Sequence, residues 1–405
     1  MTGRIRRAAA SPLAGFGAVL AVQLVGGVVQ TVGLLATLGP VGWATVSVGQ
    51  IAGFLGATLA SGGLVTFGGS LVATSEPAER PGALLGTLRA RVVCAGATFA
   101  VLLLVLSAIS PGPLAVSATT AAATLASSLA ASWYFIGRGE PARWLKADVL
   151  PFNAAAVAGV ALTWVYPSSV AYALVYAAGA SVAVVLSLRA VRADHRPAPA
   201  PPQSTVASFL VGHRALLATG AAAGVNGQGP ALLMAASGAP AVPTFLLLDR
   251  LVRYVVAGAA PLVQVTQSWV PGGGAEAMGR RARRALATTA VVAGLVSVAF
   301  GALSGPVVSA LSSGDTAVPG VDRVLFSVLV AVLVLTQVNA LAVMVPLGLG
   351  RVLAVSTSLG AVAIALGGGV AAALGGLRSI LAVTLVVELA VLLVQLRAVR
   401  RTTSR

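Results

Sequence analysis

The sequence predicts an all-α polytopic membrane protein, and three observations carry this prediction. Hydrophobic residues make up 58% of the 405 residues, and the mean hydropathy is +0.96. Only 9% of the residues are charged, whereas soluble chains have about 25%. Apolar runs of about 20 residues recur between short polar segments, and a helix of that length crosses the hydrocarbon core of a bilayer. In lipid such runs are helical, because every backbone N–H and C=O needs an internal partner.

Twelve segments have this character, and we expect each of them to be one transmembrane helix. They are residues 12–36, 42–66, 90–110, 114–136, 149–167, 169–188, 208–232, 243–267, 285–309, 322–345, 352–374 and 379–397. The basic residues before the first segment imitate the start of a secretory signal. That segment is too long for a signal-peptide core, so we predict that it is retained as span one.

Basic residues are concentrated in alternate loops, and this bias sets the predicted orientation. With the N-terminus inside, the predicted external side has only Arg323 and Arg378, and span eight contains Arg250 and Arg253. The other basic residues all fall on the cytoplasmic side, so both termini are predicted to be cytoplasmic. The net charge of +16 is therefore spread thinly over loops beside an anionic leaflet. Nucleic-acid binding is not expected, because it needs a concentrated basic face.

The stretch RADHRPAPAPPQS, residues 192–204, is Pro-rich and basic, and it cannot cross a membrane. It divides the chain into an N-terminal six-helix half (1–190), a cytoplasmic linker (191–206) and a C-terminal six-helix half (207–405). Two halves of equal span number form a parallel repeat about an axis along the membrane normal. This repeat predicts a central cavity between the halves and suits alternating access.

Spans one and seven are both interrupted by glycine, at corresponding positions of the two halves. Such pairs of interrupted spans are the best sequence indication of a transporter site. Polar amides lie among these glycines: Gln23 and Gln30 in span one, and Asn226 and Gln228 in span seven. Gln264 in span eight is a further cavity candidate. The alternative is structural, because small residues let helices approach closely while amides bond across the interface.

Span eight contains the segment FLLLDRLVRYV, residues 245–255, with three charges deep in an apolar region. Asp249 and Arg253 are four residues apart, so they share a helix face and can pair. One carboxylate cannot neutralise both Arg253 and Arg250, and Glu388 in span twelve is the other deeply placed charge. Two interpretations stay open. The four charges form a closed network that pins helices, or an arginine faces the cavity and binds a phosphate or an acidic sugar.

The sequence contains no metal-ligand cluster, nucleophile–base arrangement, Walker loop or dinucleotide fingerprint. We therefore expect no enzymatic activity, no cofactor and no bound metal. The single cysteine, Cys94, excludes an intrachain disulfide. Only one of the 26 basic residues is a lysine, which indicates a GC-rich genome. The expected location is the cytoplasmic membrane of a bacterium.

Five segments in different parts of the chain carry a family resemblance. They are LLATLGPVGWATVSVGQIAGFLGATLASGG (34–63), ASWYFIGRGEPARWLKADVLP (131–151), APAVPTFLLLDRLVRYVVAGAAPLVQV (239–265), VMVPLGLGR (343–351) and VVELAVLL (386–393). Each resembles a segment of the Wzx-like polysaccharide flippases of the MOP (multidrug/oligosaccharidyl-lipid/polysaccharide) superfamily. The segments correspond to spans one and two, the exit of span four, span eight, the exit of span ten, and span twelve.

The resemblance implies export of a lipid-linked oligosaccharide from the cytoplasmic to the outer leaflet. Arg250, Arg253 and Glu388 match the eighth-span and twelfth-span patterns and would line a cationic central cavity. The implied partners are membrane lipids, a polyprenyl-linked glycan, and a glycan polymerase with glycosyltransferases.

The chain also departs from these relatives. Lipid II flippases carry arginines in their first spans, and drug exporters carry an acid in span one. Here spans one to six have no clear charge in their interiors. A MATE-like or major facilitator-like exporter of small solutes stays open, although TSEPAERPGALLGTLRAR lacks the facilitator signature. A non-transporting scaffold of a glycan assembly complex is a further alternative.

Overall fold

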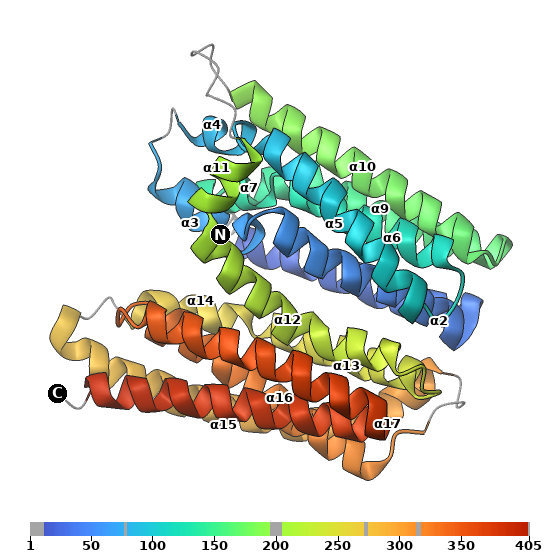
Figure 1. Cartoon of the computed structure of the whole chain (residues 1–405). Coiled ribbons are helices and arrows are strands. Elements are labelled where there is room, and N and C mark those ends of the chain that lie inside the picture. Colours follow the sequence, from blue (N-terminus) through green and yellow to red (C-terminus); the bar gives the residue numbers. More distant parts are fainter. Residues whose placement is uncertain (1–11, 77–78, 195–204, 271–273, 313–316, 404–405) are drawn as a thin grey trace, which may run out of the picture. The chain divides into compact units, whose positions relative to one another are not determined.

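The computed structural model describes residues 12–76, 79–194, 205–270, 274–312 and 317–403. The regular secondary structure of these residues is helical throughout (Figure 1). The chain forms two compact units, Met1–Gly224 and Val225–Arg405. Residues 195–204 of the predicted linker lie outside the described part, so the predicted domain limits stay a prediction.

The first unit consists of long apolar helices and several short ones. In chain order they are α2 (Pro12–Ala60), α3 (Leu64–Thr74), α4 (Arg80–Leu85), α5 (Leu88–Ile109), α6 (Leu114–Leu125), η1 (Ala126–Leu129), α7 (Ser132–Arg138), α8 (Pro141–Trp144), η2 (Leu145–Val149), α9 (Leu150–Val165), α10 (Ser169–Asp194) and α11 (Val206–Gly212). The helix α12 (Arg214–Ala236) begins in this unit and ends in the second.

The second unit continues with five helices and one π-helical segment. They are α13 (Val242–Gly258), α14 (Ala260–Trp269), α15 (Gly274–Leu311), α16 (Gly320–Val338), η4 (Asn339–Met344) and α17 (Gly350–Thr403).

The 49-residue α2 is two helices joined at a sharp break. Gly39 has φ 68°, in the left-handed region, and Pro40 follows it. A side chain at Gly33 would collide with α9, whereas one at Gly53 would collide with α6. The two halves of α2 therefore pack against different helices, and the break falls between the first two predicted spans.

The 54-residue α17 breaks in the same way at Gly376, where φ is 66°. A Cβ at Gly360 would meet Val391, and one at Gly367 would meet Val383. The later glycine therefore meets the earlier valine, which means that the two halves of α17 run antiparallel. Figure 1 shows these halves side by side, in orange-red and red. The last two predicted spans thus form a helical hairpin.

Nine helices of the described residues are long and apolar enough to cross a membrane, and ten if α11 and α12, bent by 75°, count as one span. The protein is a multi-pass membrane protein, but twelve crossings and cytoplasmic termini are not confirmed. The difference has two physical sources. α2 counts once although it breaks at Gly39, and predicted span eight is divided between α13 and α14, of 17 and 10 residues.

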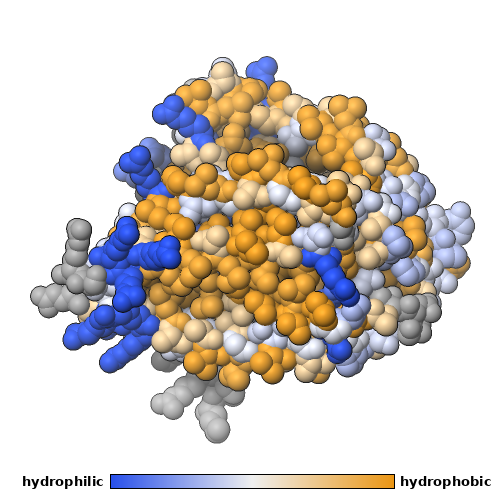
Figure 2. All heavy atoms as spheres, turned by 60° about the horizontal axis from the view of Figure 1, so that its bottom comes forward, coloured by the Kyte–Doolittle hydropathy of each residue, from blue (hydrophilic) through white to orange (hydrophobic). Residues whose placement is uncertain are grey.

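Large aliphatic side chains cover the outside of these helices. Val298 on α15 is 74% exposed and Leu366 on α17 is 69% exposed. In Figure 2 apolar residues cover most of the visible face, and hydrophilic residues gather mainly at one side of it. Apolar surface of this extent is typical of a face that contacts lipid.

Candidate functional site

The charged segment of predicted span eight lies on α13, where Asp249 and Arg253 form an ion pair. Arg253 Nε lies 2.7 Å from Asp249 Oδ2, and Arg253 Nη2 lies 3.0 Å from Asp249 Oδ1. Both carboxylate oxygens therefore accept from one guanidinium, which fixes its plane as well as its position. The predicted pairing across one helical turn is present.

Arg253 also reaches the neighbouring helix α12, where its Nη2 donates to the backbone carbonyl oxygen of Gly227. Pro230 lies within this helix. A proline lacks an N–H, so one carbonyl of the preceding turn loses its helical partner and the helix is loosened there. The interrupted segment of α12 is thus the place where the arginine of α13 docks.

A cavity of about 410 Å³ opens beside this ion pair, within the second unit. Its walls come from α12, α13, α16 and the second half of α17. Its polar lining residues are Asn226, Asp249, Arg253, Gln337, Thr384 and Glu388. Phe245 and Phe326 pack against each other at its apolar side, with ring centroids 5.6 Å apart. Four of the predicted site residues therefore meet at one cavity.

Glu388 is 4% exposed and has no ion-pair partner among the described residues. Arg250 does not line the cavity, and its Nε donates to the hydroxyl of Tyr254, 3.3 Å away. Because Glu388 pairs with neither arginine, the predicted closed network of Asp249, Arg253, Glu388 and Arg250 is not formed. A carboxylate and an arginine instead face the same cavity without pairing to each other.

The predicted amides Asn226, Gln228 and Gln264 have different surroundings, and the structure adds Gln337 to the cavity. Asn226 donates from Nδ2 to the carbonyl oxygen of Thr357, 3.2 Å away, and its buried Oδ1 has no hydrogen-bond partner. Gln337 Oε1, in the same cavity, is also buried without a partner. Gln228 Oε1 is unpartnered too, but Gln228 does not line this cavity. The side chain of Gln264 lies outside the described residues.

The amides of span one have different surroundings in the first unit. Gln23 lines a cavity of about 230 Å³ together with Asn153 and Asp148. Gln30 is buried, and its Nε2 donates to the hydroxyl of Tyr172. Gln30 therefore bonds across the interface between α2 and α10, which is the structural role that the sequence left open for these amides.

Asp148 is a cavity residue that sequence reasoning missed. It lies on the π-helix η2, and Trp144 Nε1 donates to its Oδ2 over 3.2 Å. Asp148 lies one residue before predicted span five, but the helical segment that is long and apolar enough to cross a membrane, Pro141–Val165, includes it. This candidate span begins at Pro141, eight residues before the predicted start at 149, and Arg143 near its start pairs with Glu140.

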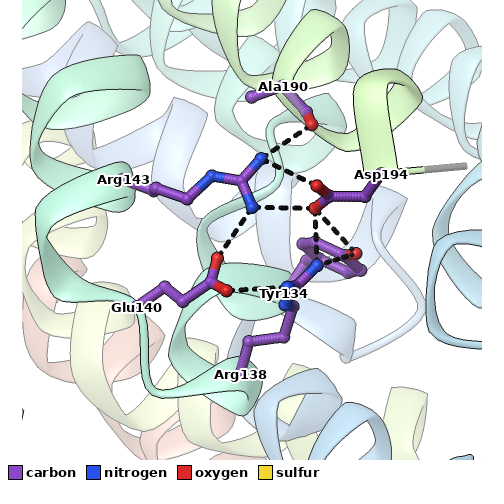
Figure 3. A network of polar contacts seen from close by, with 6 residues as sticks. All are labelled: Tyr134, Arg138, Glu140, Arg143, Ala190 and Asp194. Atoms are coloured by element: carbon purple, nitrogen blue, oxygen red, sulfur yellow. Dashed lines mark hydrogen bonds and ion pairs between the residues drawn. The ribbon is translucent and has the colours of Figure 1, made fainter. Parts of the chain in front are cut away.

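Those basic residues belong to a compact ion-pair network (Figure 3). Asp194 accepts from Arg138 at 2.5 Å and from Arg143 at 2.8 Å, and Glu140 bridges the same two arginines at 2.7 and 2.9 Å. Tyr134 Oη donates to Asp194 and accepts from Arg138. Two cations and two anions thus fix the end of α10 to the turn between α7 and α8.

An apolar groove of about 490 Å³ runs along the hairpin of α17. Valines and Leu359 form most of its walls, and Arg351 lies at one end. Only one helix separates this groove from the polar cavity, since Val387 lines the groove and Glu388 lines the cavity. On the other half of the hairpin, a Cβ at Gly360 would lie 3.4 Å from Asn226 Nδ2. A polar cavity and an apolar groove therefore share a wall within one unit.

No protein-family model matches the chain, and no curated protein matches it significantly in sequence. Solved structures of one class do match its fold. An outward-facing multidrug resistance MATE family transporter of the MOP superfamily aligns with a TM-score of 0.62 at 14% identity, over 97% of this chain and 96% of that one. An inward-facing structure of such a transporter gives 0.60 at 12% identity, over 94% of both chains.

A eukaryotic MATE transporter, AtDTX14, aligns with a TM-score of 0.52 at 16% identity, over 97% of this chain and 98% of that one. The chain therefore has the same fold as these transporters. Within that fold, the described residues contain no group of three or more His, Cys, Asp or Glu side chains placed to hold a metal ion.

Proposed function

We propose that this protein moves a lipid-linked oligosaccharide or polysaccharide precursor across the cytoplasmic membrane by alternating access. The fold supports a transporter. The observation that carries the choice of substrate is the shared wall between the Arg253 cavity and the apolar groove of α17. An amphipathic substrate has an anionic head and a long apolar tail, and this unit offers a matching surface for each.

Arg253 is suited to hold the phosphate of the head group. Its Nε and Nη2 are used by Asp249 and Gly227, and no hydrogen bond is formed by Nη1 among the described residues. The side chain is 34% exposed and lines the cavity. Asp249 thus fixes the guanidinium while one edge stays open, and a planar guanidinium binds phosphate oxygens in pairs. Asn226 and Gln337 add buried amide oxygens that accept from sugar hydroxyls.

The groove is suited to the lipid tail. Its residues run from Arg351 to Ala363 on one half of α17, which is about 18 Å of helix at 1.5 Å per residue. Its lining is almost entirely aliphatic, so an isoprenoid chain would be buried there without unpaired polar groups. In this proposal the partners are membrane lipids, the polyprenyl-linked glycan, and the polymerase and glycosyltransferases that use it. The protein itself catalyses no covalent step.

A second candidate function rests on the cavity of the first unit. Asp148 places a carboxylate there beside the amides of Gln23 and Asn153. A carboxylate with amide acceptors favours a small cationic solute. Export of such a solute is therefore the alternative to glycan flipping.

A liposome assay separates the two functions. The purified protein is reconstituted with a fluorescent lipid-linked oligosaccharide, and the labelled lipid that reaches the opposite leaflet is measured. We expect Arg253→Met to lower flipping at least tenfold and Asp148→Asn to leave it near wild type. Arg250→Met is the matched control, because Arg250 lies one helical turn away on α13 and does not line the cavity. Flipping at the wild-type rate by Arg253→Met overturns the proposal. Loss of cation export in Asp148→Asn, without loss of flipping in Arg253→Met, favours the alternative.

A further inference from the structure

Arg91, near the start of α5, is a buried cation that the proposed transport function does not use. Its side chain is 0% exposed, although the sequence placed it at the cytoplasmic end of predicted span three. Arg91 Nη1 donates to the carbonyl oxygen of Ser128 over 2.7 Å, and the guanidinium lies 5.7 Å from the ring centre of Trp133. Three elements, α5, η1 and α7, therefore meet at one guanidinium.

Four buried polar atoms of these three residues have no hydrogen-bond partner. They are Arg91 Nε, Arg91 Nη2, Trp133 Nε1 and Ser128 Oγ. Ser128 is 0% exposed and Trp133 is 1% exposed. A buried polar group without a partner costs about 1–3 kcal/mol, and more if it is charged. Four such atoms on neighbouring residues of a native fold are unusual, and a buried water or ion is the common partner of such groups.

The chemistry of the unpartnered atoms defines that occupant. Arg and Trp side chains only donate, so the occupant must accept hydrogen bonds from Arg91 and Trp133, and the Ser128 hydroxyl can donate to the same acceptor. Arg91 has no carboxylate within ion-pair distance among the described residues, so its positive charge is uncompensated. A desolvated charge of this kind requires an opposite charge. The site is closed to solvent, which favours a small anion that has no polar groups of its own to satisfy.

We propose that Arg91, Ser128 and Trp133 form a binding site for one chloride-sized anion. The anion accepts from the free edge of the guanidinium, from the indole N–H and from the hydroxyl. It also stabilises the break in the fourth predicted span, where Ala130 is extended and the helix restarts at α7. Ser187 supports the same break, because its Oγ accepts from the backbone N–H of Ala131 over 3.3 Å.

Thermal unfolding of the purified protein tests the site without any variant. We expect the Tm to be several degrees higher in sodium chloride than in sodium gluconate at equal ionic strength, because gluconate is too large to enter. The rise should saturate with chloride concentration, and radiolabelled chloride should bind with a stoichiometry near one. Equal Tm values in the two salts, without chloride binding, overturn the proposal and leave buried water as the occupant.

Variants locate the binding. Arg91→Met should abolish both the chloride-dependent rise in Tm and the bound radiolabel, and it should be at least as stable as wild type in gluconate. Arg89→Met is the matched control, since Arg89 is exposed two residues earlier on the same helix. If Arg91→Met does not fold, Trp133→Phe decides, because it keeps the ring and removes one donor. It should weaken chloride binding about 5- to 30-fold, and unchanged affinity in Trp133→Phe contradicts the site.

Discussion

Arg253 and Asp249 lie one turn apart on α13, and the arginine of this pair also donates to the Gly227 carbonyl on α12. One guanidinium thus holds together a charged helix and an interrupted one at the edge of the polar cavity. The pair has two distinct roles. It positions the arginine for a ligand, and it offsets the cost of a charge at this depth.

Removal of the Asp249 carboxylate tests how much the pair offsets the cost of the Arg253 charge. Asp249→Asn should lower the free energy of unfolding by about 1–3 kcal/mol, because Arg253 loses two charge-assisted hydrogen bonds. Denaturant unfolding in detergent measures the change. The double variant Asp249→Asn/Arg253→Met should be less destabilised than the sum of the single variants, since the asparagine costs little once the guanidinium is gone. Additive effects would show that the two side chains are not energetically coupled.

Removal of the Glu388 charge should not destabilise the protein, in contrast to removal of the Asp249 charge. Its carboxylate is buried and has no ion-pair partner among the described residues. Glu388→Gln keeps the shape and removes a charge that is costly to bury, so the variant should be as stable as wild type or about 1 kcal/mol more stable. Thermal unfolding in detergent measures this. Destabilisation by several kcal/mol would mean that the carboxylate has a strong cationic partner.

The break in α2 should depend on its glycine. Gly39 has φ 68°, which costs a residue with a Cβ about 1–2 kcal/mol, although no neighbouring atom stands in the way. Gly39→Ala should therefore lower the Tm. Gly96→Ala on α5 is the control, because this site is helical and open, and there alanine should stabilise by about 0.5–1 kcal/mol. Equal shifts in the two variants would contradict a conformational role for Gly39.

The network around Asp194 should depend on salt. Its charged side chains are 21–35% exposed, so screening reaches them. Asp194→Asn should destabilise by about 1 kcal/mol at low salt and by less in 1 M salt. Tm values at the two ionic strengths, taken beside wild type, measure the difference. A salt-independent loss would indicate packing rather than ion pairing as the role of Asp194.

Composition and periodicity were sufficient to predict the fold class, because lipid allows only helices for long apolar runs. The Asp249–Arg253 pair was also predictable, since its spacing alone places both side chains on one helix face. The breaks in α2 and α17 follow from glycine conformation, and Gly39 before Pro40 marks one of them in the sequence.

The rest depends on contacts between distant segments. Arg91 looks like a charge at the end of a span in the sequence, because its burial depends on contacts with Ser128 and Trp133, about 40 residues later in the chain. Asp148 looks like a loop charge, because it stands one residue before the predicted start of span five. Arg250 and Arg253 are three residues apart, so their side chains leave the helix in directions that differ by about 60° around its axis. The sequence could not show which of these arginines faces the cavity, because that depends on how α13 packs against α12 and α17.

The Asp249–Arg253 pair also has an electrical consequence for the proposed cargo. The charges of the pair cancel within one helical turn, and the third charged residue of the lining, Glu388, is acidic. The cavity wall therefore brings no net positive charge to a pyrophosphate head. The substrate would then cross with most of its own negative charge. Moving one elementary charge through a membrane potential of about 100 mV is worth about 2.3 kcal/mol. With a negative cell interior, the resting voltage would by itself drive such a substrate outward.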